Sequence, residues 1–226
     1  MSPTGRQAGT VLVVGAGPTG LLLAGDLAAA GIGCTVLERR DAETGNLTRA
    51  FGVHARTLEM LDMRGVADDL VATGERVGAV RLMGVARLDL SRLPGRFPYV
   101  LVTPQYETER VLRERALAAG AEIEHGAEVV GLRQDAAGVD VEVRTSGGAT
   151  RTRRASYVVG ADGARSTVRR LLGLPFPGQT AVRSVMLADV RLKDPPGTVL
   201  TADAADDAFA LLVPFGDGWY RVAAWN

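Results

Sequence analysis

Residues 10–40 read TVLVVGAGPTGLLLAGDLAAAGIGCTVLERR, and this stretch decides the fold. It opens with an apolar, β-branched run without polar alternation, as expected of a strand buried on both faces of a parallel sheet. A glycine-rich turn follows, then a helical stretch that stops at Gly31 and a second apolar run that ends at Glu38. Strand, turn, helix and strand in this order predict a complete βαβ unit.

The turn carries the spacing Gly-x-Gly-x-x-Gly. Such glycines are weak evidence alone, but here they follow a buried strand and open a helix. In that setting the first glycine permits the turn, the second lets a pyrophosphate approach the backbone, and the third lets helix and strand pack closely. We therefore expect these turn residues to bind the phosphates of a dinucleotide: Gly15, Gly17, Pro18, Thr19 and Gly20.

Glu38 ends the second predicted strand, and Arg39 follows it. A carboxylate at this position accepts hydrogen bonds from the hydroxyls of an adenosine ribose and disfavours a 2′-phosphate. The pair therefore predicts a site for the ADP part of FAD or NAD. A tight turn that binds no ligand is the alternative.

A second glycine motif follows the short apolar run Tyr157–Val159. It contains Asp162 and Gly163, with Ser166 a few residues later. Taken alone, this segment is equally compatible with a plain turn in which Ser166 caps a short helix.

With both motifs in this order, the chain resembles the class A flavoprotein monooxygenases, the para-hydroxybenzoate hydroxylase-like family of FAD-dependent aromatic hydroxylases. In that family the first motif holds the ADP part of FAD, and the Asp-Gly motif serves both FAD and the nicotinamide cofactor. The resemblance implies these roles for Asp162 and Gly163. It also implies that Arg49 reaches the phosphate and ribose region of the flavin and that Gln105 contacts the ribityl chain and pyrophosphate. Arg49 and Arg165 are its candidates for contact with NAD(P)H.

The resemblance spans residues 10–225 and is nearest to the bacterial branch that acts on polyketide aromatics, phenols and rifamycin-like antibiotics. It implies that NADPH or NADH reduces the flavin, that O2 adds to give a C4a-hydroperoxide, and that one oxygen atom passes to an electron-rich aromatic substrate. The cofactor carries this chemistry, so no catalytic side chain is assigned. The alternatives are an NAD(P)-dependent oxidoreductase without oxygen insertion, or an FAD- or nucleotide-binding module or fragment without turnover.

We expect an α/β fold in which residues 1–175 form a Rossmann-like FAD-binding domain around a parallel sheet, with a β excursion at 76–98. Residues 176–226 are expected to start a substrate domain built on a mostly antiparallel sheet. The later Gly-Asp motif of the family is not found, because Gly216-Asp217 lies between two strand-like runs and predicts a hairpin turn. We therefore expect an incomplete part of a longer protein, with the missing C-terminal half as its partner, and little bound FAD or activity in isolation.

The composition narrows the choice of partners. Among 226 residues, 26 Lys and Arg balance 26 Asp and Glu, which argues against a nucleic-acid binder. The single cysteine, Cys34, cannot form an internal disulfide, and no metal-binding Cys/His cluster is visible, so a cytoplasmic protein without a metal is expected. The apolar stretch 11–25 is broken by glycine and proline and is shorter than the roughly 20 residues of a membrane span.

The remaining candidates are expected to be structural. His54 and His125 show no nucleophile partner or metal-ligand spacing. The aromatic residues Trp219, Tyr220 and Trp225 are expected to pack on strands, with a role in an aromatic substrate pocket as the alternative.

Overall fold

The computed structural model describes residues 10–42, 50–83, 85–179, 184–194, 200–216 and 218–225. The chain comprises two compact units, each built from two separate stretches. The first unit contains Met1–Asn46 and Glu109–Pro177, and the second contains Leu47–Thr108 and Gly178–Asn226.

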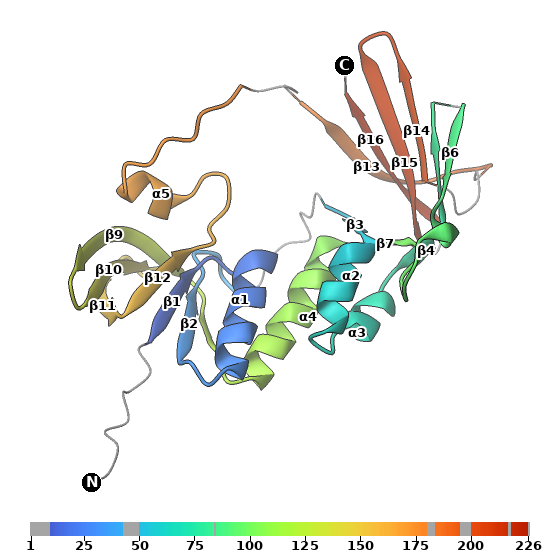
Figure 1. Cartoon of the computed structure of the whole chain (residues 1–226). Coiled ribbons are helices and arrows are strands. Elements are labelled where there is room, and N and C mark those ends of the chain that lie inside the picture. Colours follow the sequence, from blue (N-terminus) through green and yellow to red (C-terminus); the bar gives the residue numbers. More distant parts are fainter. Residues whose placement is uncertain are drawn as a thin grey trace. The chain divides into compact units, whose positions relative to one another are not determined.

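A four-stranded parallel sheet forms the centre of the first unit (Figure 1). Val11 pairs with Cys34 on one side and with Tyr157 on the other, so the predicted βαβ unit and the third predicted strand share one sheet. Every residue of the first two strands is buried, which explains why Thr35 is the one polar residue among them. In spatial order the strands are β12 (Tyr157–Gly160), β1 (Val11–Val14), β2 (Cys34–Leu37) and β8 (Glu122–Glu124).

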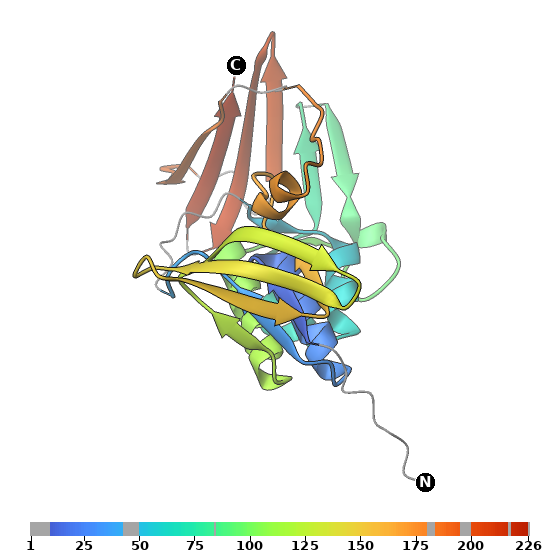
Figure 2. The same cartoon turned by 90° about the vertical axis from the view of Figure 1, so that its left-hand side faces the viewer.

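Helix α1 (Pro18–Ala29) packs on β1 and β2, as the βαβ prediction requires. A second, antiparallel sheet supplies a hydrophobic core with the parallel sheet, where Leu12 and Leu37 meet Val141 and Val143. Figure 2 shows this sheet in yellow, crossing the blue strands β1 and β2. The strands of this antiparallel sheet are β9 (Ala127–Asp135), β10 (Gly138–Thr145) and β11 (Thr150–Ala155). Helix α5 (Thr167–Leu171) packs on β9 and adds Val168 to the same core.

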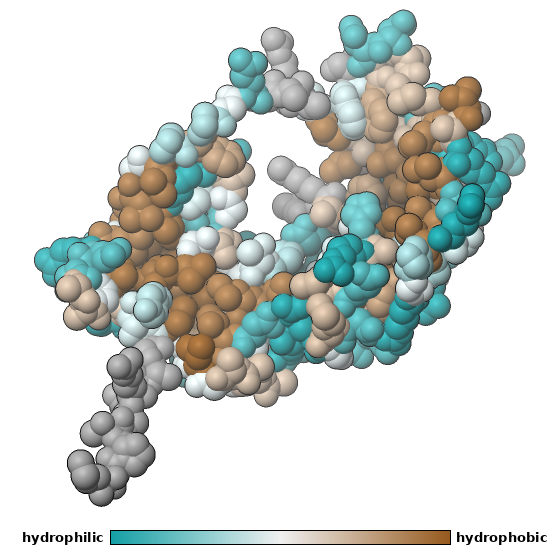
Figure 3. Space-filling model, viewed as in Figure 1, coloured by the Kyte–Doolittle hydropathy of each residue, from teal (hydrophilic) through white to brown (hydrophobic). Residues whose placement is uncertain are grey.

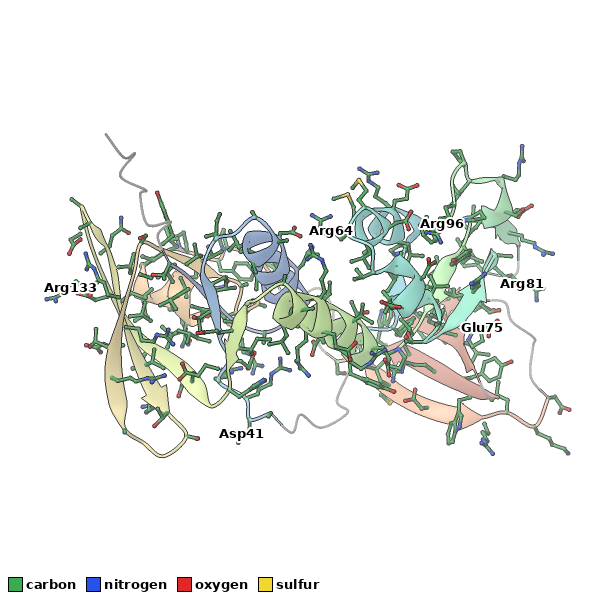
Figure 4. All side chains as sticks on the ribbon, turned by 90° about the horizontal axis from the view of Figure 1, so that it is seen from below. Asp41, Arg64, Glu75, Arg81, Arg96 and Arg133 are labelled. Atoms are coloured by element: carbon green, nitrogen blue, oxygen red, sulfur yellow. The ribbon has the colours of Figure 1, made fainter. Side chains whose placement is uncertain are left out.

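A hairpin turn that ends at Gly138 joins β9 to β10. Gly138 has a φ of +151°, and the Asp135 carboxylate accepts hydrogen bonds from the backbone N–H groups of Ala137 (2.7 Å) and Gly138 (3.0 Å). Arg133, on the same hairpin, projects away from the sheet in Figure 4 and pairs with Asp140 at 3.3 Å.

The second unit contains two short helices and a small antiparallel sheet. Arg96 joins the helices by pairing with Asp62 and with Asp68 (Figure 4). The helices are α2 (Ala55–Asp62) and α3 (Ala67–Val71), and a 3-10 turn covers Leu90–Arg92. The sheet order is β3 (Gly52–Val53), β7 (Val100–Val102) and β4 (Glu75–Val77). Helix α4 (Gln105–Ala118) starts in this unit and continues into the first.

A six-stranded sheet forms the rest of the second unit. One of its faces packs on the small sheet through Val213, which meets Val77 and Val102 in a buried cluster. Figure 3 shows hydrophobic residues gathered over this C-terminal sheet. In spatial order its strands are β13 (Met186–Arg191), β16 (Trp219–Trp225), β15 (Ala208–Gly216), β14 (Leu200–Ala205), β5 (Ala79–Leu82) and β6 (Ala86–Asp89).

The mostly antiparallel sheet is therefore confirmed, with one exception: β14 runs parallel to β5, with Leu200 opposite Val80. Gly216 pairs with Trp219, which confirms the predicted hairpin, although Asp217 lies outside the described residues. The excursion at 76–98 belongs to the longer stretch Leu47–Thr108 that clusters with the C-terminal strands. The functional domain boundary at 175/176 stays a prediction. None of the helices in the described ranges is long and apolar enough to cross a membrane.

Candidate cofactor site

The first and third glycines of the turn are fixed by space and backbone conformation. Gly15 has a φ of +105°, and a Cβ there would lie 2.7 Å from the carbonyl oxygen of Ala161. A Cβ on Gly20 would lie 1.9 Å from the carbonyl oxygen of Gly15, so a side chain would force helix α1 away from the turn. Both roles that the sequence predicted for these glycines, turn and close packing, are present in the structure.

Gly17 differs from its two partners, because a Cβ there would meet nothing within 4 Å. It is the N-cap residue of α1, and no side chain from the described residues caps this helix N-terminus. Pro18 occupies the first helical turn, which contains no acidic residue. The positive end of the α1 dipole therefore faces an open space beside backbone, which suits a phosphate.

Glu38 connects this turn to the end of β2. It is 6% exposed, and its carboxylate reaches back to accept a 2.8 Å hydrogen bond from the backbone N–H of Ala16. The other oxygen accepts the backbone N–H of Arg40 at 2.9 Å. The Arg40 guanidinium adds bonds of 3.0 Å from Nε to Oε1 and 3.3 Å from Nη2 to Oε2.

These contacts determine the charge of Glu38. Burial raises the pKa of its carboxyl, but hydrogen bonds from Arg40 and from Ala16 outweigh burial and hold the pKa below its usual 4.5. Glu38 is therefore an ionised, buried carboxylate at neutral pH. The sequence indicated the carboxylate but gave no role to Arg40, whose only signal was its place directly after Arg39.

The Asp-Gly motif meets the glycine turn and builds its own local structure. The Cα of Asp162 would lie 3.0 Å from a Cβ on Gly15, so the structure brings these two predicted positions together. The Asp162 carboxylate accepts hydrogen bonds from Ser166 Oγ (2.5 Å) and from the backbone N–H groups of Thr167 (2.5 Å) and Val168 (3.2 Å).

Ser166 is the N-cap of α5 and accepts a hydrogen bond from the backbone N–H of Arg169. The contacts therefore show that Ser166 caps a short helix, one of the two interpretations that the sequence left open. Gly163 has a φ of +78°, which favours glycine at the tip of the turn.

The other predicted cofactor residues lie elsewhere in the chain. Arg49 lies outside the described residues. Gln105 begins α4 as expected, and its backbone N–H donates to the carbonyl oxygen of Ala50 at 3.2 Å within the second unit. Arg39 and Arg165 are exposed. Their contacts with a cofactor stay predictions.

The cysteine, the two histidines and the aromatic Tyr220 lie at structural positions in helices, strands or turns. Cys34 is buried at the start of β2, where burial raises the pKa of its thiol. His54 is the N-cap residue of α2, and the buried Nδ1 of His125 has no hydrogen-bond partner within the described part of the chain. Tyr220 is buried on its strand. Over the described ranges, no group of three or more His, Cys, Asp or Glu residues is placed to hold a metal ion.

A hollow of about 420 Å³ lies on the C-terminal sheet of the second unit. Most of its lining is alanine, and Trp225 at its edge stacks on Phe209 with ring centroids 4.1 Å apart. Met186 and the Asp203 carboxylate complete the lining. Trp225 therefore packs against Phe209 and also lines a hollow, and its role in a substrate pocket stays a prediction.

The parallel sheet, the glycine turn and the carboxylate at the end of β2 define a dinucleotide-binding protein. Comparison of the sequence with known families then identifies the family: residues 9–225 match the FAD binding domain, and the chain belongs to that family. Its relatives are class A flavoprotein monooxygenases, as the sequence resemblance indicated.

Individual relatives show how far the likeness extends. The chain is 46% identical over 186 residues to 12-dehydrotetracycline 5-monooxygenase/anhydrotetracycline 6-monooxygenase of Streptomyces rimosus, covering 81% of this chain and 36% of that protein. The solved structure of OxyS anhydrotetracycline hydroxylase from Streptomyces rimosus has a TM-score of 0.81 and 40% identity, covering 96% of this chain and 44% of that one. The Diels-Alderase PyrE3 of pyrroindomycin biosynthesis has a TM-score of 0.77 and 30% identity, covering 95% and 46%. The chain thus spans less than half the length of each.

Proposed function

We propose that the intact protein is an FAD-dependent monooxygenase that hydroxylates an aromatic small molecule, phenolic or polyketide-derived, with NADPH or NADH as electron donor and O2 as oxygen source. Membership of the FAD binding domain family and the similarity to an anhydrotetracycline monooxygenase and an anhydrotetracycline hydroxylase support this reaction class. The oxygen-transfer route implied by the family resemblance, the electron donor and the cytoplasmic location are part of the proposal.

The observation that carries the proposal is the open space at Gly17, beside an uncapped helix N-terminus and next to the buried Glu38 carboxylate. Phosphates require backbone N–H donors and positive potential, and ribose hydroxyls require an acceptor. The turn and Glu38 supply both, and Ala16 links them through its bond to Glu38. The residues present therefore fit the ADP part of FAD.

We assign the cofactor contacts accordingly. Gly15, Gly17, Pro18, Thr19 and Gly20 would surround the pyrophosphate, and Glu38 and Arg39 would hold the adenosine. Further along the cofactor would lie Arg49, Gln105, Asp162 and Gly163, with Arg49 and Arg165 toward NAD(P)H. Because Asp162 orders the Asp-Gly turn by capping α5, its side chain would act on the cofactor by positioning the turn backbone next to Gly15.

When bound, FAD would supply electron transfer and oxygen activation, while this chain supplies binding and orientation. No general acid or base from the described residues is needed for that division of labour. The hollow on the C-terminal sheet, with Phe209 and Trp225 at its edge, is a candidate surface for an apolar substrate.

A second candidate function is a reaction without oxygen insertion. The Diels-Alderase relative shares the fold and 30% of the sequence, so the fold does not decide the reaction. An NAD(P)-dependent oxidoreductase is one such alternative, and an FAD-binding module without turnover is a separate one.

The test uses the intact protein and a panel of polycyclic phenols. A flavin absorbance spectrum after extensive dialysis reports the cofactor, and NADPH or NADH consumption is followed with and without each phenol. Reactions under ¹⁸O2 are expected to give a product heavier by one labelled oxygen atom, and an anaerobic reaction serves as control. Bound flavin with substrate-dependent NAD(P)H consumption but unlabelled product would reject the hydroxylase function, and a protein without flavin would reject FAD as cofactor.

A further inference from the structure

The Glu38 carboxylate is saturated with donors from its own chain. An ionised carboxylate offers about four lone-pair positions. In the structure Oε1 accepts from the backbone N–H and the Nε of Arg40, and Oε2 accepts from the backbone N–H of Ala16 and from Arg40 Nη2. Two of the four donors are backbone groups, and the other two belong to one guanidinium.

This arrangement conflicts with the role that the proposed function gives to Glu38. Ribose hydroxyls need acceptor positions on the carboxylate, and the two backbone donors belong to the glycine turn and to the main chain just after β2. Only the Arg40 side chain is able to leave, because it lies beyond the end of β2 and is 44% exposed. Binding of an adenosine ribose to Glu38 therefore requires that this guanidinium move away.

A second carboxylate lies within reach of the Arg40 guanidinium. Glu109 of α4 has its Oε2 4.0 Å from Arg40 Nη1, at the outer limit of an ion pair, and its side chain is buried. Arg40 lies between two buried carboxylates in the first unit and bonds closely to only one of them. A small rotation would exchange the two partners without leaving the cation unpaired.

We propose that Arg40 occupies the ribose position of Glu38 in the ligand-free protein and shifts its ion pair to Glu109 when the adenosine half of FAD binds. The inference rests on FAD being the cofactor. Arg40 is then a positioning residue that sets the affinity for the adenosine half of FAD. The Arg40 guanidinium keeps Glu38 charged and oriented, and it competes with the ribose for the same carboxylate. The competition lowers the apparent affinity by the fraction of protein in which Glu38 is accessible.

The first test compares Arg40→Met with the unchanged protein, both stripped of flavin. Methionine keeps an unbranched apolar side chain and the backbone N–H but cannot donate to Glu38. Calorimetric titration uses ADP and FAD, with FMN as the probe that lacks adenosine. We expect Arg40→Met to bind ADP and FAD roughly three- to tenfold more tightly, because charge-assisted hydrogen bonds no longer have to be exchanged. FMN affinity is expected to be unchanged.

Two further variants serve as controls for this test. Arg133→Met removes one positive charge from an exposed site of the same unit and is expected to leave ADP affinity unchanged. Arg40→Lys keeps the charge but loses the two-pronged contact, so its ADP affinity is expected to lie between those of the unchanged protein and Arg40→Met. Far-ultraviolet circular dichroism and the FMN titration report whether each variant is folded.

A double-mutant cycle tests the shift to Glu109. Glu109→Gln is expected to weaken ADP binding two- to fivefold when Arg40 is present, roughly the effect of losing one partly screened ion pair, and to have no effect in Arg40→Met. Weaker or unchanged ADP binding by Arg40→Met, or an equal effect of Glu109→Gln in both backgrounds, would overturn the inference. Failure of every variant and of the unchanged protein to bind FAD or ADP would instead overturn the proposed function on which it rests.

Discussion

At the scale of single residues, the three glycines of the turn perform separable tasks. Gly20 has no room for a side chain, because an added Cβ would lie 1.9 Å from the carbonyl oxygen of Gly15. Because that contact is with backbone, relief requires a shift of α1 against β1. We expect Gly20→Ala to lower the free energy of unfolding by roughly 2–3 kcal/mol, measured by urea denaturation.

Gly17→Ala is the matched control. Its Cβ would meet nothing within 4 Å, and the φ of −78° is open to alanine. We expect unfolding in urea to change by less than about 0.5 kcal/mol, while FAD affinity falls, because the methyl group would fill the space assigned to the pyrophosphate. Equal losses of stability in both variants would contradict the separation of roles.

Glu38 gives the protein a predictable dependence on pH. Its pKa is lower in the folded protein than in the unfolded chain, so its ionised form stabilises the fold above the unfolded value of about 4.5. This stabilisation is lost as pH falls through the folded pKa. We expect the difference in unfolding free energy between the unchanged protein and Glu38→Gln to be constant at neutral pH and to shrink below pH 4.5. A difference that persists unchanged in acid would show that the charge of Glu38 is not what stabilises the fold.

The sequence identified the glycines and Glu38 because strand, turn and helix fix their positions within one local unit. It did not identify Arg40, since the partner that matters, Glu109, lies on a helix far along the chain. It also left the role of Asp162 open between cap and ligand. Spacing alone does not show that Ser166 Oγ and two backbone N–H groups already bond to that carboxylate.

At the scale of elements, α5 and the turn before it depend on Asp162. Replacement by alanine removes all three hydrogen bonds that its carboxylate accepts. We expect Asp162→Ala to destabilise the flavin-free protein by about 2 kcal/mol, and Ser166→Ala by about 1 kcal/mol, both measured in urea. If Asp162→Ala altered FAD affinity without any loss of stability in the flavin-free protein, the capping role would be refuted.

The elements themselves followed the sequence where the pattern was local and strong. The buried runs of β1 and β2 and the helix between them were predicted correctly. Strand β14 was missed, because three of its six residues are alanine and one is aspartate, and both residue types are depleted in strands. Its parallel pairing with β5 joins segments more than a hundred residues apart, and no local pattern specifies such a partner.

In the molecule as a whole, each of the two units is built from two separate stretches of the chain. Residues 47–108 belong to the same unit as the C-terminal strands. A reading along the sequence gives a single break near residue 175, because composition changes there. The sequence predicts a β excursion from the first domain at 76–98. The full extent of this segment depends on long-range pairings such as β14 with β5, which a sequence pattern does not specify.

The first unit also presents apolar surface that should control its behaviour in solution. Within the described residues, β12 pairs only with β1 and forms an edge of the parallel sheet, with Tyr157 69% exposed on it. Leu172, Leu174 and Phe176 are exposed after α5. An open strand edge together with exposed apolar side chains favours association between copies.

We therefore expect residues 1–226, purified alone, to self-associate as concentration rises, as measured by light scattering during size-exclusion chromatography. Leu172→Glu combined with Leu174→Glu should shift the population toward monomer, because charges replace apolar side chains on the exposed segment. Arg133→Glu, which places a negative charge on an exposed position of β9, is the control and should leave association unchanged. A chain that stays monomeric over the whole concentration range would show that this surface does not drive association, and association unaffected by the leucine changes would place the contact elsewhere.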